Sequence, residues 1–91
     1  MEQKARQVVF KGHVQGVGFR YTTQRIAGRH GLNGYVKNCP DGTVEAFFQG
    51  TEPNVEACID AIRDAFSGYL RDVKTVDKPA NPQYTDFRIA Y

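Results

Sequence analysis

A glycine-rich stretch followed by a single arginine contains the residue types needed to bind an anion. Three glycines, Gly12, Gly16 and Gly18, stand within seven residues, and Arg20 follows them. Glycine permits positive φ and lets main-chain N–H groups approach a ligand closely. An arginine adds a fixed charge and a planar fork of donors that suits phosphate oxygens. The stretch therefore predicts a small phosphate-binding loop.

A strand and a helix are expected on the two sides of this loop. Residues 7–14 alternate in side-chain direction and are rich in valine, which predicts a strand, and residues 21–30 are expected to form a helix. The first turn of a helix offers unpaired N–H donors and the positive end of the helix dipole. Many turns of this kind bind nothing, and neither the dinucleotide-binding fingerprint nor the Walker pattern is complete here. A purely structural turn therefore stays open as the alternative.

The rest of the chain alternates between strand and helix patterns. Strands are predicted for residues 33–38, 43–50, 70–78 and 87–91, a second helix for residues 52–67, and a loose tail for residues 1–6. The second helix carries apolar residues on one face, namely Val55, Cys58, Ile59, Ile62 and Phe66. This order predicts an α+β, ferredoxin-like βαββαβ sandwich: an antiparallel sheet with two helices on one face and a short extra C-terminal strand.

Length and composition limit the function classes further. Ninety-one residues are expected to form a single domain, residues 1–91. The formal net charge of +2 is too small to argue for a nucleic-acid partner. We find no apolar run of membrane-spanning length and no apolar segment typical of a signal peptide, so a cytoplasmic protein without a membrane partner is expected. The two cysteines lack the spacing of metal ligands, so no metal site is expected.

Three stretches of the chain resemble the acylphosphatase family. Residues 14–20 (VQGVGFR) resemble the family signature, residues 34–38 (GYVKN) followed by 41–45 (DGTVE) give a second similarity, and residues 87–91 (FRIAY) a third. The resemblance implies the same ferredoxin-like fold. It also implies an enzyme that hydrolyses the carboxyl–phosphate anhydride of small acyl phosphates to carboxylate and inorganic phosphate, with no metal, no cofactor and no phosphoenzyme.

The same resemblance assigns roles to individual residues. Arg20 is expected to bind the phosphoryl group and Asn38 to orient the attacking water. The backbone amides expected to bind phosphate are those of Gln15, Gly16, Val17, Gly18 and Phe19. These roles agree with the residue types, because we find no Ser–His pair, paired carboxylates or metal cluster near the loop in sequence. Catalysis by such a site must rest on electrostatics and positioning.

Other functions stay open at this point. An RNA-binding ferredoxin-like module would use Phe47 and Tyr35 on the open sheet face, although the third strand lacks the RNA-binding pattern. A domain that binds acyl or carbamoyl phosphate with little or no turnover would retain the same loop, as in the N-terminal domain of hydrogenase-maturation carbamoyltransferases. Cys39 adjoins Asn38, so its modification is expected to perturb the site. A monomer is expected from the small size.

Overall fold

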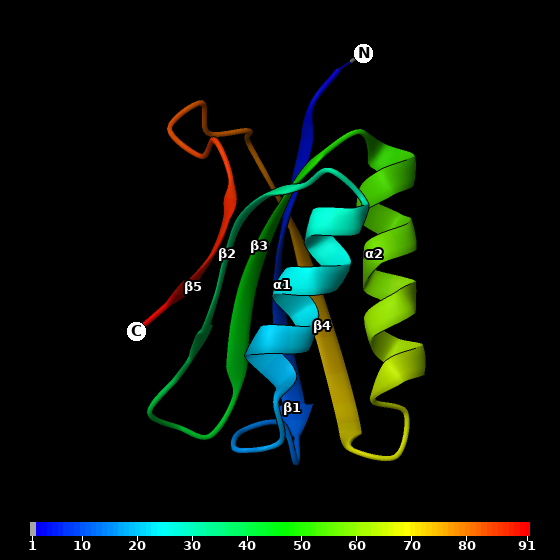
Figure 1. Ribbon diagram of the computed structural model, residues 1–91, viewed down its shortest axis with the longest axis vertical. Helices are drawn as coiled ribbons and strands as arrows, with labels where there is room; N and C mark the ends of the chain where they lie inside the picture. The colour runs from blue at the N-terminus through cyan, green and yellow to red at the C-terminus, as the bar shows by residue number, and fades with distance from the viewer. Residues whose placement is uncertain (1) are drawn as a thin grey trace.

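The helices and strands follow one another in the order that the sequence predicts. The computed structural model describes residues 2–91. The elements within this range are β1 (Lys4–Gly12), α1 (Phe19–Arg29), β2 (Asn33–Asn38), β3 (Val44–Gly50), α2 (Glu52–Ala65), β4 (Leu70–Lys78) and β5 (Phe87–Ala90). The strands form one sheet in the order β4-β1-β3-β2-β5, and both helices cover the same face of it (Figure 1). The predicted ferredoxin-like fold is thus confirmed.

The sheet is mixed because its last strand pairs in parallel with its neighbour, whereas the other neighbouring strands pair antiparallel. β1 pairs antiparallel with β3 and β4, and β2 pairs antiparallel with β3. β5 joins the outer edge of β2 in parallel, with Phe87 opposite Gly34. The C-terminal strand was expected, but its orientation was not assigned from the sequence. This pairing carries the end of the chain toward the same end of the sheet as Asn38.

The first strand and the first helix both begin earlier than predicted. The loose tail expected for residues 1–6 is wrong from Lys4 onward, because Lys4 lies opposite Gly50 in β3. Arg6 also ties this end of β1 to α2, since its guanidinium donates to the carboxylates of Glu52 and Glu56 at 3.4 and 3.2 Å. The helix α1 begins at Phe19 instead of residue 21, so the arginine lies in its first turn.

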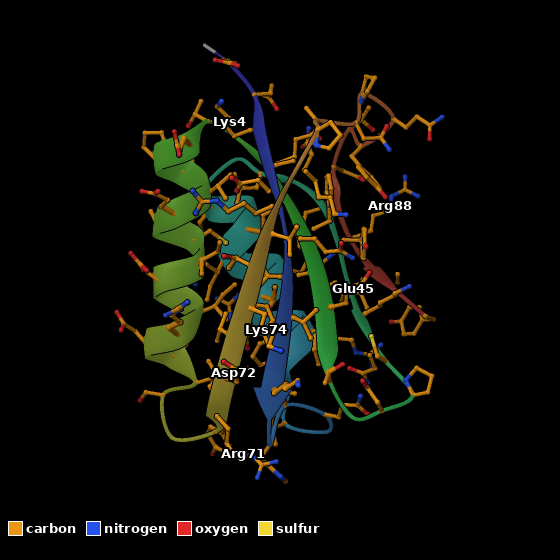
Figure 2. All side chains as sticks on the ribbon, turned by 180° about the vertical axis from the view of Figure 1, so that it is seen from behind. Lys4, Glu45, Arg71, Asp72, Lys74 and Arg88 are labelled. Atoms are coloured by element: carbon orange, nitrogen blue, oxygen red, sulfur yellow. The ribbon has the colours of Figure 1, made fainter. Side chains whose placement is uncertain are left out.

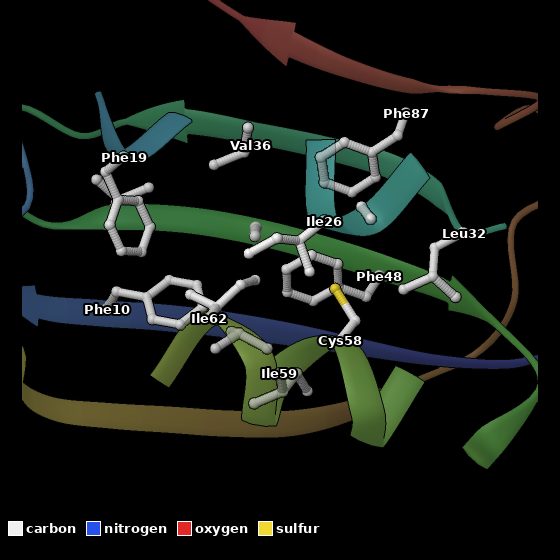
Figure 3. Close-up of a cluster of buried hydrophobic side chains, with 14 of the residues drawn as sticks. Phe10, Phe19, Ile26, Leu32, Val36, Phe48, Cys58, Ile59, Ile62 and Phe87 are labelled. Carbon is white, nitrogen blue, oxygen red and sulfur yellow. The ribbon is translucent and has the colours of Figure 1, made fainter. Parts of the chain in front are cut away.

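The core fills the space between the sheet and the two helices (Figure 3). All five residues predicted for the apolar face of α2 are buried: Val55, Cys58, Ile59, Ile62 and Phe66. From the sheet side, Phe10 and Phe48 are fully buried, and Phe19 from α1 packs against Phe10 with ring centroids 5.0 Å apart. Close packing at Phe19 fixes the start of α1, and therefore the end of the glycine-rich loop, against the sheet.

No helix of residues 2–91 covers the other face of the sheet (Figure 2). Charged side chains such as Asp72 and Lys74 extend from β4 on this side (Figure 2). None of the helices within residues 2–91 has the length and apolar character needed to cross a bilayer.

Candidate active site

The glycine-rich loop is held at both ends by buried side chains. Val14 and Phe19 are each about 1% exposed and belong to the hydrophobic core. Between them, Gly16 and Gly18 have φ values of 78° and 76°, in the left-handed region that glycine adopts without strain. Val17 packs against the core from the same loop. With its side chains directed inward, the loop presents mainly backbone to the solvent.

The backbone donors of this loop have no partners within the protein. None of the N–H groups of residues 15–20 donates a hydrogen bond to an acceptor in residues 2–91. The N–H groups of Phe19, Arg20 and Tyr21 belong to the first turn of α1, where the helix leaves its donors free. The first turn contains no acidic side chain that would compete for them. A row of free amides next to a helix N-terminus is a ready anion-binding site.

Arg20 supplies the positive charge at this position. Its guanidinium carbon lies 5.1 Å from the centroid of the ring of Tyr91, which follows β5. No carboxylate in residues 2–91 forms an ion pair with Arg20, whereas the donors of Arg6 and Arg88 are engaged by carboxylates. A stacked guanidinium keeps the N–H donors on its edge free for an oxyanion.

Asn38 reaches the same site from the end of β2. Side chains alternate along this strand, and the fully buried Val36 shows which face is directed toward the helices. Asn38 follows Val36 by two residues and therefore lies on the helix-covered face. It is exposed there because it is the last residue of the strand. The β2–β3 turn and the glycine-rich loop lie at the same end of the molecule, the lower end of Figure 1.

One surface hollow is lined by most of the site residues predicted from the sequence. It has a volume of about 320 Å³, and the residues lining it are Val14, Gly16, Gly18, Phe19, Arg20, Tyr21, Asn38, Ile89 and Tyr91. Arg20 and Asn38, which are far apart in the sequence, are thus brought together as expected. Gln15 and Val17 belong to the same loop but do not line the hollow. Sequence reasoning missed Tyr21, Ile89 and Tyr91, whose apolar surfaces form its walls.

The side chain of Gln15 connects the loop to the β2–β3 turn. Its Nε2 atom donates to the carbonyl oxygens of Cys39 and Thr43, at 2.9 Å each. The sequence analysis treated Gln15 only as a source of a backbone amide. Nothing in the sequence pattern indicates these bonds, because the two acceptors are backbone groups on a distant turn.

The turn itself is held by Asp41. Its Oδ1 atom accepts hydrogen bonds from the hydroxyl of Thr43 at 2.6 Å and from the N–H of Thr43 at 3.0 Å. The hydroxyl bond, with the backbone bond second, holds the pKa of the Asp41 carboxyl below its usual range, since both favour the ionised form. A charged Asp41 therefore stabilises the turn that follows Asn38 directly.

Two larger hollows lie at the opposite end of β2, around Tyr35 and Tyr84, with volumes of about 460 and 430 Å³. They contain no helix N-terminus and no arginine without a carboxylate partner, and the segment that includes Tyr84 packs over Phe47. Phe47 is only 9% exposed, and its ring centroid lies 5.1 Å from that of Tyr84. The hydroxyl of Tyr35 donates to the carboxylate of Glu45. The aromatic platform that RNA binding requires is therefore largely covered.

The described part of the chain, residues 2–91, contains no group of three or more His, Cys, Asp or Glu side chains placed to hold a metal ion. Cys58 lies in the core, where burial raises its thiol pKa to about 12, and it takes no part in the site. Cys39 is half-buried next to Asn38. The chemical groups that converge on the hollow are thus backbone amides, one guanidinium and one carboxamide.

Comparison with known proteins shows which family this chain is similar to. Residues 6–89 match the sequence profile of the acylphosphatase family. An acylphosphatase from Picrophilus torridus is 41% identical over 83 residues, which cover 91% of this chain and 98% of that protein.

Solved structures show the same similarity. The crystal structure of the acylphosphatase from Bacillus subtilis superposes with a TM-score of 0.88 at 29% identity, covering 97% of this chain and 99% of that one. Full-length HypF, in its phosphate- and nucleotide-bound form, gives a TM-score of 0.88 at 29% identity. The similarity to HypF covers 99% of this chain but only 12% of that protein.

Proposed function

Since the chain belongs to the acylphosphatase family, we propose that it hydrolyses the carboxyl–phosphate anhydride of small acyl phosphates by metal-independent, in-line attack of a water molecule. The products are a carboxylate and inorganic phosphate. The observation that carries this mechanism is the convergence of Arg20, Asn38 and the free amides of the glycine-rich loop on one hollow.

The phosphoryl group is held by the loop and by Arg20. The backbone N–H groups of Gln15, Gly16, Val17, Gly18 and Phe19 donate to its oxygens. The Arg20 side chain adds a charge-assisted contact. In a loose phosphoryl-transfer transition state, negative charge spreads over the three equatorial oxygens. Preorganised donors that need not reorient during the reaction stabilise this charge most effectively.

Asn38 orients the attacking water. A carboxamide offers both a donor and an acceptor, so it can fix the direction of a water molecule without removing its proton. Its position at the end of β2, lining the same hollow as the first turn of α1, supports this role. Positioning of this kind contributes through effective concentration and alignment.

The leaving group explains why so few catalytic groups suffice. The carboxylate of an acyl phosphate is already a good leaving group and needs no strong general acid. Holding the phosphoryl group, stabilising its oxygens and aligning a water are therefore the whole task. The expectation of no cofactor follows from this chemistry.

A second function is supported by the similarity to HypF. There a domain of this fold makes up a small part of a longer chain, in a structure that contains phosphate and nucleotide. A domain that binds acyl or carbamoyl phosphate with little turnover would use the same loop. The two functions differ in whether bound acyl phosphate is hydrolysed.

Hydrolysis of benzoyl phosphate in the presence of EDTA tests the proposal directly. We expect rapid turnover by the wild-type protein and a loss of kcat/KM of about 10³-fold or more for Arg20→Ala. Asn38→Ala should lower kcat by about 10²-fold or more. Arg29→Ala is the matched control for charge, because Arg29 lies in the last turn of α1 and does not line the hollow.

Each outcome has a distinct meaning. Activity that survives Arg20→Ala would show that the loop is not the site. A wild-type protein that binds phosphate but does not hydrolyse benzoyl phosphate would favour the binding domain. Activity that requires an added metal ion would overturn the metal-independent mechanism.

A further inference from the structure

The side-chain amide of Gln15 uses both of its N–H donors on a single turn. The two acceptors are the carbonyl oxygens of Cys39 and Thr43. These two residues are also joined to each other, because the Cys39 N–H donates to the Thr43 carbonyl at 2.9 Å. The Gln15 amide therefore binds both ends of the β2–β3 turn, at the point where the backbone bond between Cys39 and Thr43 closes that turn. Two short bonds from one planar group fix both the distance and the orientation of that turn.

These bonds lie between the two halves of the active site. Gln15 directly precedes Gly16 in the phosphate-binding loop, and Cys39 directly follows Asn38. Within residues 2–91, they are the hydrogen bonds that join loop residues 14–18 to turn residues 38–43. The pairing of Asn38 with Val44 fixes it in the sheet, and the side chain of Gln15 adds the direct hydrogen-bonded link between the end of β2 and the loop.

We propose that Gln15 is a positioning residue, which sets the distance between Asn38 and the phosphate-binding loop through its amide bonds to the Cys39 and Thr43 carbonyls. This inference rests on the proposed function, because it concerns the alignment of the water with the bound phosphoryl group. The residue acts through Asn38 and contacts neither substrate nor water with its side chain.

The proposal predicts a specific separation of kinetic effects. The phosphoryl group is held by the loop amides and Arg20, neither of which needs the turn. The water is held by Asn38, whose position depends on the turn. A displacement of about 1 Å in a reacting group is enough to lower a rate by about 10²-fold. Loss of the Gln15 amide should therefore lower kcat and leave the affinity for phosphate nearly unchanged.

Gln15→Met is the first test, because methionine has a similar length and no hydrogen-bond donor. We expect kcat for benzoyl phosphate to fall by about 10- to 100-fold. The inhibition constant of inorganic phosphate should change by less than about threefold, because the loop amides and Arg20 are retained.

The matched control is Gln49→Met. Gln49 also makes two hydrogen bonds to backbone groups, both on Asn81, at the opposite end of β3. The Gln49→Met protein should lose an amount of stability comparable to that lost by Gln15→Met, and its kcat should equal that of the wild type. A general loosening of the fold would lower kcat in both variants, whereas the proposal requires the loss to be confined to Gln15→Met.

Gln15→Glu supplies a readout that a merely structural role would not give. A carboxylate at this position faces two carbonyl oxygens and repels both, whereas the protonated acid donates to one of them. These neighbours favour the neutral form, so the pKa of the introduced carboxyl should be raised. The kcat of Gln15→Glu relative to wild type should then rise as the pH is lowered from about 8 to about 5. A ratio independent of pH contradicts the proposal.

NMR titration with inorganic phosphate tests the same coupling without turnover. In the wild type, phosphate should shift the amide signals of Gly16 and Gly18 and also the side-chain NH₂ signal of Asn38. In Gln15→Met the loop signals should still shift, and the Asn38 signal should no longer respond.

An unchanged Asn38 response together with unchanged kcat overturns the inference, even if hydrolysis itself is confirmed. Loss of phosphate binding in Gln15→Met equal to the loss of kcat also overturns it, because the side chain would then support the loop instead of the turn. A wild-type protein that shows the Asn38 coupling but no hydrolysis would contradict the proposed function and retain the coupling.

Discussion

The guanidinium carbon of Arg20 lies 5.1 Å from the centroid of the Tyr91 ring. Arg20 is in the first turn of α1, and Tyr91 follows the last residue of β5. The parallel pairing of β5 with β2 is what brings the C-terminal residue beneath the arginine. In the proposed mechanism, this exposed aromatic face contacts the guanidinium and leaves its edge donors free for an oxyanion.

Removal of this ring should weaken phosphate binding. An exposed cation–π contact contributes about 0.5–1 kcal/mol, so Tyr91→Ala should raise the inhibition constant of inorganic phosphate by about two- to fivefold. Tyr91→Phe keeps the ring and should bind phosphate as the wild type does. Inhibition of benzoyl phosphate hydrolysis by phosphate measures both constants. Equal affinities in all three proteins would show that the ring does not restrain Arg20.

Local patterns, together with the resemblance to the acylphosphatase family, predict the two segments that line the hollow. Gly16 and Gly18 were recognised because positive φ is a property of the residue itself. The direction of Asn38 follows from the period of two along β2, on which Val36 is buried. The fold order then required both segments to lie at the same end of the sheet. The inferences on the glycines and on the direction of Asn38 use a few neighbouring residues, whereas the last uses the order of the elements along the chain.

Contacts between distant segments did not follow from the sequence. The bonds from Gln15 are made to backbone carbonyls, which every residue has, so no residue type marks them. The place of Tyr91 depends on the parallel sense of β5, which its few residues do not specify. The early start of β1 likewise depends on pairing of Lys4 with Gly50. In each case, tertiary pairing decides what local propensity leaves open.

Two glycine substitutions should distinguish the backbone strain of the phosphate-binding loop from a steric clash between β2 and β3. An alanine Cβ at position 16 would have no atom within 4 Å, so Gly16→Ala costs only the left-handed conformation, about 1–2 kcal/mol. We expect it to fold and to bind phosphate more weakly. An alanine Cβ at position 34 would overlap the carbonyl oxygen of Phe47, because β2 and β3 approach closely there. Gly34→Ala should fail to fold at 37 °C.

Far-UV circular dichroism during heating, followed by phosphate titration of the folded variant, measures both effects. Gly28→Ala is the control, since Gly28 lies in α1 with open space around it and no positive φ. It should be as stable as the wild type or more so, because alanine favours a helix. A Gly34→Ala protein with wild-type stability would contradict the close approach of the strands.

Stability should depend on the charge of Asp41 in acid. The folded state lowers the pKa of this carboxyl, so the ionised form stabilises the fold above the unfolded pKa of about 3.9. That contribution is lost as the pH falls through the lower, folded-state pKa. Asp41→Asn keeps an oxygen that can accept both bonds from Thr43, but it cannot ionise.

The wild type should therefore be more stable than Asp41→Asn near neutral pH, and the difference should shrink below about pH 4. Urea unfolding at a series of pH values measures the free-energy difference directly. A difference that stays constant down to the lowest pH would show that the Thr43 bonds do not depend on the carboxylate charge.

The two cysteines should differ sharply in reactivity. Cys58 is fully buried, and burial raises its thiol pKa to about 12, so the reactive thiolate is scarce even in mild alkali. Cys39 is half-buried on the turn after Asn38. Iodoacetamide should therefore label Cys39 in the native protein and label Cys58 only after unfolding. Mass spectrometry of the labelled peptides identifies each site.

Alkylation of Cys39 should also lower hydrolysis, because the added group lies beside the carbonyl that accepts from Gln15 and next to Asn38, to which the proposed mechanism assigns the orientation of the water. The control is Cys39→Ser, which has no thiol at this position and should lose no activity when treated with iodoacetamide. Full activity of the wild type after complete labelling of Cys39 would show that the turn tolerates the added group and that this thiol has no influence on the site.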